Sequence, residues 1–349
     1  MPSSSLSSQT YQVPDTVEAI EFYYEKGLTD GLPVVPPTPD RVVEFLQAAK
    51  KQPGDVLGTI PTRKREITAE KVAINAIMAG CLPEYMPVVA TAIEAMCQDQ
   101  FNLHGTSAST AGTGHMVIVH GPIARELDIN CANNLFGPTK RSNATIGRAI
   151  RLILMNVCGS VPGVLDKSTF GHPGKYSYCI AENEELSPWE PLHVERGLSL
   201  ETSAVTVLAG NAPLQGDDHV SHTAEGILTS IANGILAQAY PNCGEFMVLI
   251  SPELLGHIRD EGWSKKDVRN FLFEATKRPG PFWNRRLASW DPNDPQMGGE
   301  DITAAVTSPD DFMILVAGGS AGGFFCTVMP WGGGRGSATK SVTLAIPNV

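Results

Sequence analysis

Apolar residues along this chain follow two periods, one helical and one strand-like. Helical spacing predicts helices over residues 14–26 and 222–240, and two helices broken near Gly80 and Pro83 over residues 68–96. Short, continuous apolar runs predict strands, which lie over residues 116–121, 203–210, 245–250, 311–319 and 341–346. Because helices and strands alternate, we expect an α/β fold whose mixed or mostly parallel sheet is covered by helices on both faces.

Two stretches of the chain share one order of elements. MVIVHGPIARELDI and MVLISPELLGHIRD each read as a strand, then a proline, then a helix. This likeness favours two similar α/β units, over residues 60–200 and 201–349, although two short matches are limited support for a duplication.

Length and charge narrow the class of protein. The chain has 349 residues, of which 42% are hydrophobic, so we expect a single large domain over residues 13–349 after a disordered tail of residues 1–12. The net charge of −11 argues against a basic surface for nucleic acid. No apolar run reaches the about 18 residues of a membrane span, and the first residues lack a signal-peptide pattern. We therefore predict a cytoplasmic protein that binds small molecules and has neither nucleic-acid nor membrane partners.

The segment from His172 to Arg196 concentrates chemically active side chains. Residues 175–181 alternate like a strand, and three carboxylates follow at its carboxyl end, where open α/β sheets usually bind ligands. Carboxylates beside a histidine can hold different protonation states at neutral pH, which suits proton transfer. The candidate catalytic residues are Lys175, Cys179, Glu182, Glu184 and His193.

These residues also have other interpretations. Lys175 either orients an anion or, if it is desolvated, acts as a base, and Cys179 is a nucleophile only if a cation or a helix end lowers its pKa. Seven cysteines without a CxxC pair indicate buried thiols rather than disulfides or a thiolate zinc site, and Cys158 and Cys179 depart furthest from that interpretation. The carboxylates fit equally a solvated loop that pairs with neighbouring arginines.

Three features are candidates for binding an anionic substrate. Arg141, Asn143 and Arg148 lie at the start of a helix predicted within residues 137–154, where free N–H groups and cations together attract anions. His172 opens the active segment, and Arg335 lies in a glycine-rich stretch whose backbone can approach an oxyanion closely. Solvated or paired charges and a flexible turn are the corresponding structural interpretations.

A divalent metal is the one cofactor that the sequence raises. Asp218 and His219 lie in a loop dense in Asp and His, and such a loop can bind a divalent ion. His104, His115 and His120 flank another loop and could add ligands. Helix capping by the same loop explains part of the pattern without a metal.

Four phrases of the chain stand out as distinctive: DGLPVVPPT (30–38), AGCLPEYMPVV (79–89), NATIGRAIRL (143–152) and GKYSYCIAENEELSPWEPLHVERG (174–197). They resemble a poorly characterised family that is associated with small selenocysteine or cysteine proteins of the UGSC type. The resemblance extends across most of the chain and supplies no catalytic residues. It implies a thiol- or selenol-bearing partner protein, and hence redox chemistry or carbon–heteroatom cleavage. Residues 158–161 read CGSV rather than CGSC, so that family's redox site is not assigned to them.

Taken together, these patterns favour an enzyme that acts on a small anionic organic molecule by acid–base chemistry of the lyase, hydratase or hydrolase type. A thiol-redox subunit that needs a partner protein and a non-catalytic metabolite-binding protein are the alternatives. Residues 277–300 read as a long loop, which makes a homo-oligomer one expectation.

Overall fold

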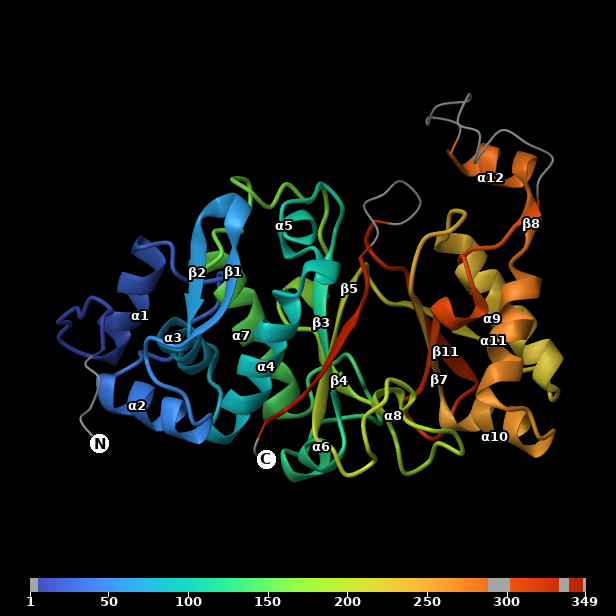
Figure 1. Cartoon of the computed structure of the whole chain (residues 1–349), viewed down its shortest axis with the longest axis horizontal. Coiled ribbons are helices and arrows are strands. Elements are labelled where there is room, and N and C mark those ends of the chain that lie inside the picture. Colours follow the sequence, from blue (N-terminus) through green and yellow to red (C-terminus); the bar gives the residue numbers. More distant parts are fainter. Residues whose placement is uncertain (1–5, 288–301, 333–338, 348–349) are drawn as a thin grey trace.

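Two four-stranded sheets lie face to face at the centre of the molecule, and helices cover the outer side of each (Figure 1). The computed structural model describes residues 6–287, 302–332 and 339–347. Both sheets contain one parallel pair of strands and two antiparallel neighbours, so the predicted mixed α/β fold is confirmed.

The first sheet has the strand order β12-β5-β3-β4, and only β3 and β4 are parallel. Its strands are β3 (Gly114–His120), β4 (Cys179–Ala181), β5 (Ala204–Gly210) and β12 (Val342–Ala345). The second sheet has the order β10-β7-β11-β6, and only β10 and β7 are parallel. Its strands are β6 (Leu214–Asp217), β7 (Phe246–Ile250), β10 (Phe312–Val316) and β11 (Phe324–Val328). The two stretches that look alike in sequence begin on β3 and β7, which hold matching positions in the two sheets.

Apolar side chains from both sheets form one core layer between them. Met116 and Ile118 of β3 meet Met247 of β7 and Leu315 of β10, and all four are completely buried. Every residue of β3, β5, β7 and β10 is buried. These strands therefore appear in the sequence as continuous apolar runs.

In the described part of the chain, the longer helices cover one face of each sheet. Those over the first sheet are α2 (Pro39–Ala48), α3 (Ala69–Ala79), α4 (Met86–Met96) and α7 (Arg141–Asn156). Those over the second are α9 (Ala224–Gln238), α10 (Pro252–Asp260) and α11 (Lys265–Ala275). The expectation of one sheet with helices on both faces differs from this arrangement, because an apolar run shows that both faces of a strand are buried but not what buries them.

Shorter elements complete the chain. The helices are α1 (Thr16–Glu25), α5 (Leu103–Thr106), α6 (Pro122–Glu126), α8 (Leu192–Glu195) and α12 (Gly280–Leu287). The strand pairs are β1 (Val56–Ile60) with β2 (Arg65–Thr68), and β8 (Arg278–Pro279) with β9 (Ile302–Thr303). The single-turn 3-10 helices are η1 (Pro61–Arg63), η2 (Pro83–Tyr85), η3 (Asp99–Phe101), η4 (Pro173–Lys175) and η5 (Pro309–Asp311).

Several boundaries differ from the sequence prediction. The strand expected over residues 175–181 contains only β4, because a 3-10 turn begins at Pro173 and leaves Tyr176 exposed. The loop expected over residues 277–300 contains β8 and α12, and its part from residue 288 lies outside the described residues. Ser7 belongs to the predicted tail, yet its N–H and hydroxyl both donate to Glu70 of α3.

Candidate functional site

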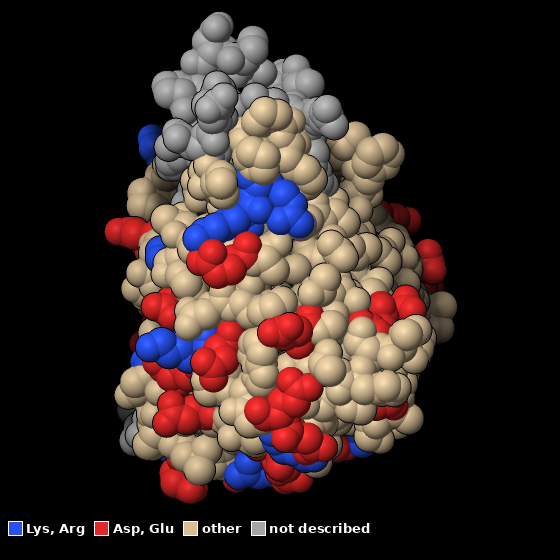
Figure 2. Space-filling model, turned by 90° about the vertical axis from the view of Figure 1, so that its right-hand side faces the viewer, with Lys and Arg blue, Asp and Glu red and all other residues tan. Residues whose placement is uncertain are grey.

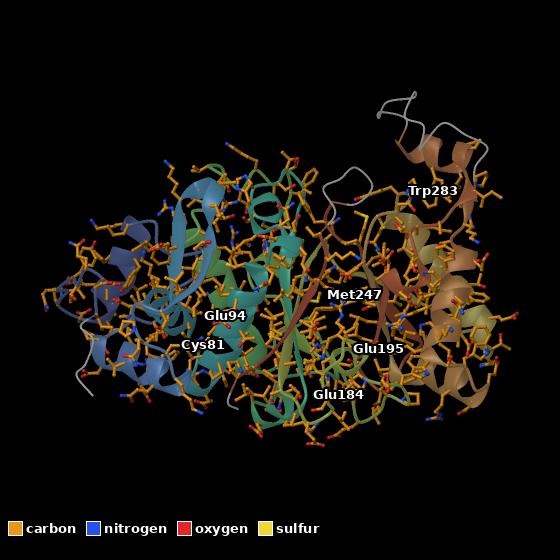
Figure 3. The ribbon with its side chains drawn as sticks, viewed as in Figure 1. Cys81, Glu94, Glu184, Glu195, Met247 and Trp283 are labelled. Carbon is orange, nitrogen blue, oxygen red and sulfur yellow. The ribbon has the colours of Figure 1, made fainter. Side chains whose placement is uncertain are left out.

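Four titratable side chains meet at the carboxyl edge of the parallel pair β3–β4. The register pairs Val119 with Ala181, so the next residues along the two strands, His120 and Glu182, lie beside each other. Glu184 follows in the same loop, and α8 brings His193 to the group. Figure 3 shows Glu184 at the lower edge of the first sheet, with Glu195 close by at the end of α8.

The four groups are close together and almost completely buried. His120 Nδ1 lies 3.8 Å from Glu182 Oε2, and His193 Nδ1 lies 3.6 Å from Glu184 Oε1. The two imidazole rings stack with centroids 5.3 Å apart. No part of the His120, Glu182 or His193 side chains is exposed, and 10% of the Glu184 side chain is. Such a set of ionisable groups is costly to bury, so it is characteristic of a functional site rather than of a core.

Backbone N–H groups hold the two carboxylates in place. Gly121 donates its N–H to Glu184 Oε1 at 2.9 Å, and Leu192 donates to Glu182 Oε2 at 2.9 Å. Gly121 has a φ of 73°, and a Cβ there would lie 2.4 Å from the carbonyl oxygen of Thr202. Glycine is therefore required at this position, where the chain leaves β3 and turns into α6.

Two threonines orient His120. Its Nε2 lies 2.9 Å from Thr206 Oγ1 of β5, which in turn lies 2.8 Å from Thr343 Oγ1 of β12. This bond leaves Nδ1 directed at the carboxylates. His120 Nδ1, both ring nitrogens of His193 and Glu182 Oε1 have no hydrogen-bond partner within the described part of the chain. Buried polar atoms are nearly always bonded, so these four indicate a site built for a proton, a water molecule or a ligand.

The nearest buried cation is largely committed elsewhere. Lys265 Nζ lies 4.0 Å from Glu182 Oε1 but donates to Glu195 at 2.9 Å. Arg269 makes two further hydrogen bonds to Glu195, each 3.0 Å long. The charge of Glu182 is therefore compensated only in part.

Burial shifts the proton affinities of two members of the group. It raises the pKa of the Glu182 carboxyl to about 7, and Lys265 opposes the shift. It lowers the pKa of His120 far below its usual value, and the neighbouring His193 and Arg196 lower it further. At neutral pH His120 is neutral, and Glu182 can both take up and release a proton.

The structure brings three of the predicted catalytic residues together and separates the others. Glu182, Glu184 and His193 share the site. Lys175 and His172 lie beyond the opposite end of β4, where Lys175 Nζ pairs with Asp166 at 2.8 Å. Cys179 lies buried within β4, and burial raises the pKa of its thiol. The condition for a nucleophilic Cys179, a lowered pKa, is therefore not met.

Three of the five residues predicted to bind an anion have partners within the chain. Arg141 donates to the carbonyl oxygen of Gly80, and the Asn143 amide donates to that of Cys179. Arg148 makes two hydrogen bonds to Asp30, at 2.8 and 2.9 Å. These contacts match the paired-charge interpretation of the segment. Arg335 lies outside the described residues.

The predicted metal ligands Asp218 and His219 do not form a cluster. The Asp218 carboxylate accepts hydrogen bonds from Val220, Ser221 and Ser230, and half of the His219 side chain is exposed. In the described part of the chain, the group of three side chains able to hold a metal is His120, Glu184 and His193, with one ligand atom of each within 4.8 Å of the others. A metal site on residues 218–219 stays a prediction, and the group His120, Glu184 and His193 is a second candidate.

Three residues of the site have little or no signature in the sequence. Lys265 and Arg269 come from α11, far along the chain, and nothing in their local pattern indicates the contact. Thr206 lies within an apolar strand. His120, which the sequence raised as a possible further metal ligand, is the polar residue that ends an apolar run.

A cavity of about 290 Å³ opens at the carboxyl ends of β7 and β10. Its lining includes Ser251 after β7 and Gly318 after β10, together with residues 134–137. The N–H of Asn183, between the two site glutamates, donates to Val316 at the end of β10. One backbone hydrogen bond therefore links the loop that carries the two glutamates to the strand β10, whose end lies at the cavity, but none of the four side chains of the His/Glu group lines the cavity. The ends of neighbouring strands are a common place for ligands in α/β folds.

Neither the charge of the surface nor a likeness to known proteins indicates a function. Acidic side chains are spread over the face formed by the second helical layer, and the basic ones on its described part form no continuous stripe (Figure 2). No helix of the described residues is both long and apolar enough to cross a membrane. Neither protein-family models nor curated proteins nor solved structures give a match to the chain.

Proposed function

We propose that this chain is an enzyme of the lyase, hydratase or hydrolase type, which acts on a small anionic organic molecule at the group His120, Glu182, Glu184 and His193. The observation that supports it is the convergence of two imidazoles and two carboxylates, buried and with unpartnered atoms, at the carboxyl edge of a parallel strand pair. A purely structural core gains nothing from such a group, because each unpartnered atom is destabilising.

The contacts suggest a division of roles. Glu182 has one oxygen fixed by the Leu192 N–H and one without a partner, so the second can exchange a proton with a substrate. His193 has both ring nitrogens without partners and can relay that proton. His120 and Glu184 are each held by one hydrogen bond and shape the site.

Two features favour a small anionic substrate. Arg125 Nη1 lies 3.8 Å from Glu184 Oε2 at the edge of the group, and 55% of its side chain is exposed, so it can meet an incoming anion. The cavity of about 290 Å³ at the neighbouring strand ends suits a molecule of metabolite size.

The buried cysteines do not favour a thiol reaction on this chain. Burial raises the pKa of Cys158 to about 12, and it raises the pKa of Cys179 as well. A thiolate is therefore a minor species at either position near neutral pH. If the chain works with a cysteine- or selenocysteine-containing partner, as its family resemblance implies, that partner would supply the reactive sulfur or selenium.

Turnover in D₂O tests the proposal, because lyase or hydratase chemistry incorporates deuterium into the substrate and hydrolysis forms a new product. The purified chain is incubated in D₂O with a panel of small carboxylates and phosphates, and proton NMR follows the loss of C–H signals and new resonances. We expect E182Q to lower the rate by about 10²- to 10⁴-fold. The matched control is E185Q, which changes an exposed carboxylate of the same loop. Equal rates for E182Q and E185Q, or tight binding of a panel member without any turnover, would contradict the proposal and favour a metabolite-binding protein.

A further inference from the structure

We infer that His120, Glu184 and His193 bind one divalent transition-metal ion, through His120 Nδ1, a Glu184 carboxylate oxygen and one ring nitrogen of His193. Glu182 lies beside the ion in this arrangement. The inference deepens the proposed function and rests on it only for the role of the ion in catalysis, because the binding itself follows from the ligand atoms.

The directions of the lone pairs carry the argument. Thr206 occupies His120 Nε2, so Nδ1 carries the lone pair if Nε2 bears the ring proton. That lone pair faces Glu182 at 3.8 Å, and His193 Nδ1 faces Glu184 at 3.6 Å. With Glu182 and Glu184 ionised, at least three of these four facing atoms are acceptors in an almost completely buried site, and a cation among them turns their repulsion into attraction.

The surroundings of the ligands are those of a metal site. Metal-binding histidines usually use their second ring nitrogen for an orienting hydrogen bond, as His120 does with Thr206. Glu184 is oriented by the Gly121 N–H in the same way. The nearest buried ammonium group, that of Lys265, is bound to Glu195 and lies 4.0 Å from Glu182, so it does not fill the position between the imidazoles.

The ligand set selects the kind of ion. Two imidazoles with one or two carboxylates suit Zn²⁺, Fe²⁺, Mn²⁺, Co²⁺ or Ni²⁺, whereas Ca²⁺ and Mg²⁺ prefer oxygen ligands. Bonds of about 2.1 Å place adjacent ligands about 3 to 3.4 Å apart. The three groups now lie within 4.8 Å of one another, so they would close slightly around the ion. Three protein ligands leave a position for water or substrate, which the ion would polarise.

Cobalt binding by the full-length chain tests the inference. The protein is stripped with a chelator, dialysed and titrated with Co²⁺, and the visible absorption reports imidazole ligation. We expect one equivalent for the wild-type chain and loss of this absorption in H193A and E184Q. The T206V variant, which removes only the orienting bond, should weaken binding by about 10- to 100-fold. The control H219A changes an exposed histidine outside the group and should bind as the wild type does.

Further measurements separate folding failure from ligand loss. Circular dichroism checks each variant, and a rise in the melting temperature of the wild-type chain with Co²⁺ must be absent in E184Q. Sub-stoichiometric binding by the wild-type chain, or equal affinity in wild type and E184Q, would overturn the inference. Turnover that survives complete chelation would overturn the ion's catalytic role but leave the acid–base proposal, whereas stoichiometric metal without any turnover would overturn the proposed function alone.

Discussion

Arg148 provides the most quantitative test of the fold, because one helix residue holds an entire proline-rich segment. From α7 its guanidinium binds Asp30 through two hydrogen bonds and donates to the carbonyl oxygens of Leu32 and Pro33. The Asp30 side chain is 3% exposed and that of Arg148 is 15% exposed. Although burial opposes ionisation, the Arg148 guanidinium keeps the pKa of Asp30 below its usual value. The charge pair is therefore shielded from water on both sides.

Replacing Arg148 with Met leaves the buried Asp30 carboxylate without its cation. Removing one member of a buried ion pair costs about 3 to 5 kcal/mol, and we expect about 3 kcal/mol because Arg148 retains some exposure. The D30N and D30N/R148M variants complete a double-mutant cycle, in which the double variant should be about 1 to 3 kcal/mol more stable than the sum of the single losses. Urea unfolding followed by circular dichroism gives the free energies. A loss below about 1 kcal/mol for R148M would refute a structural role and return Arg148 to the predicted anion site.

Buried groups give three more testable expectations. Burial is the main cause that lowers the pKa of His115, to about 3. The positive charges of Lys175, Arg151 and Arg63 also lower this pKa, and the negative charge of Asp166 opposes them. In the unfolded chain His115 takes up a proton below its ordinary pKa, so stability falls as the pH drops from about 6.5. The share of His115 in the loss at pH 5 is about 2 kcal/mol, and H115Q should lose about that much less than the wild type by urea unfolding. G121A should be less stable than G163A, because Gly163 has a similar φ of 77° but nothing within 4 Å of an added Cβ; equal melting temperatures would contradict the close approach to Thr202. Cys158 and Cys179 should resist a thiol reagent at neutral pH until the chain unfolds, and rapid labelling of either would contradict their burial.

The elements that could be predicted from the sequence are those whose burial is uniform. β3, β5, β7 and β10 are buried along their whole length, so their apolar runs indicate strands directly. The break between α3 and α4 follows from Gly80, which ends α3 with a φ of 91°. The same runs do not reveal that the opposite sheet, rather than a second helical layer, covers the inner faces, because apolar contacts carry no direction.

Three of the four side chains of the candidate site could be predicted from the sequence for a similar reason. Glu182 and Glu184 follow a strand end directly, and His193 lies a few residues on, so local order is enough to group them. His120 joins them only through the parallel pairing of β3 with β4, and Lys265 only through the packing of α11. Conversely, the charge of Arg148 suggested a ligand because its partner, Asp30, lies 118 residues away in the chain.

The measurement that tests the central claim most directly is the turnover rate of E182Q in D₂O beside that of E185Q, on whichever small anion the wild-type chain turns over. Chemistry at the buried His/Glu group predicts a fall of about 10²- to 10⁴-fold for E182Q and an unchanged rate for E185Q. If a folded E182Q chain turned the substrate over as fast as the wild-type chain, the chemistry would lie elsewhere in the molecule, and the account would be contradicted.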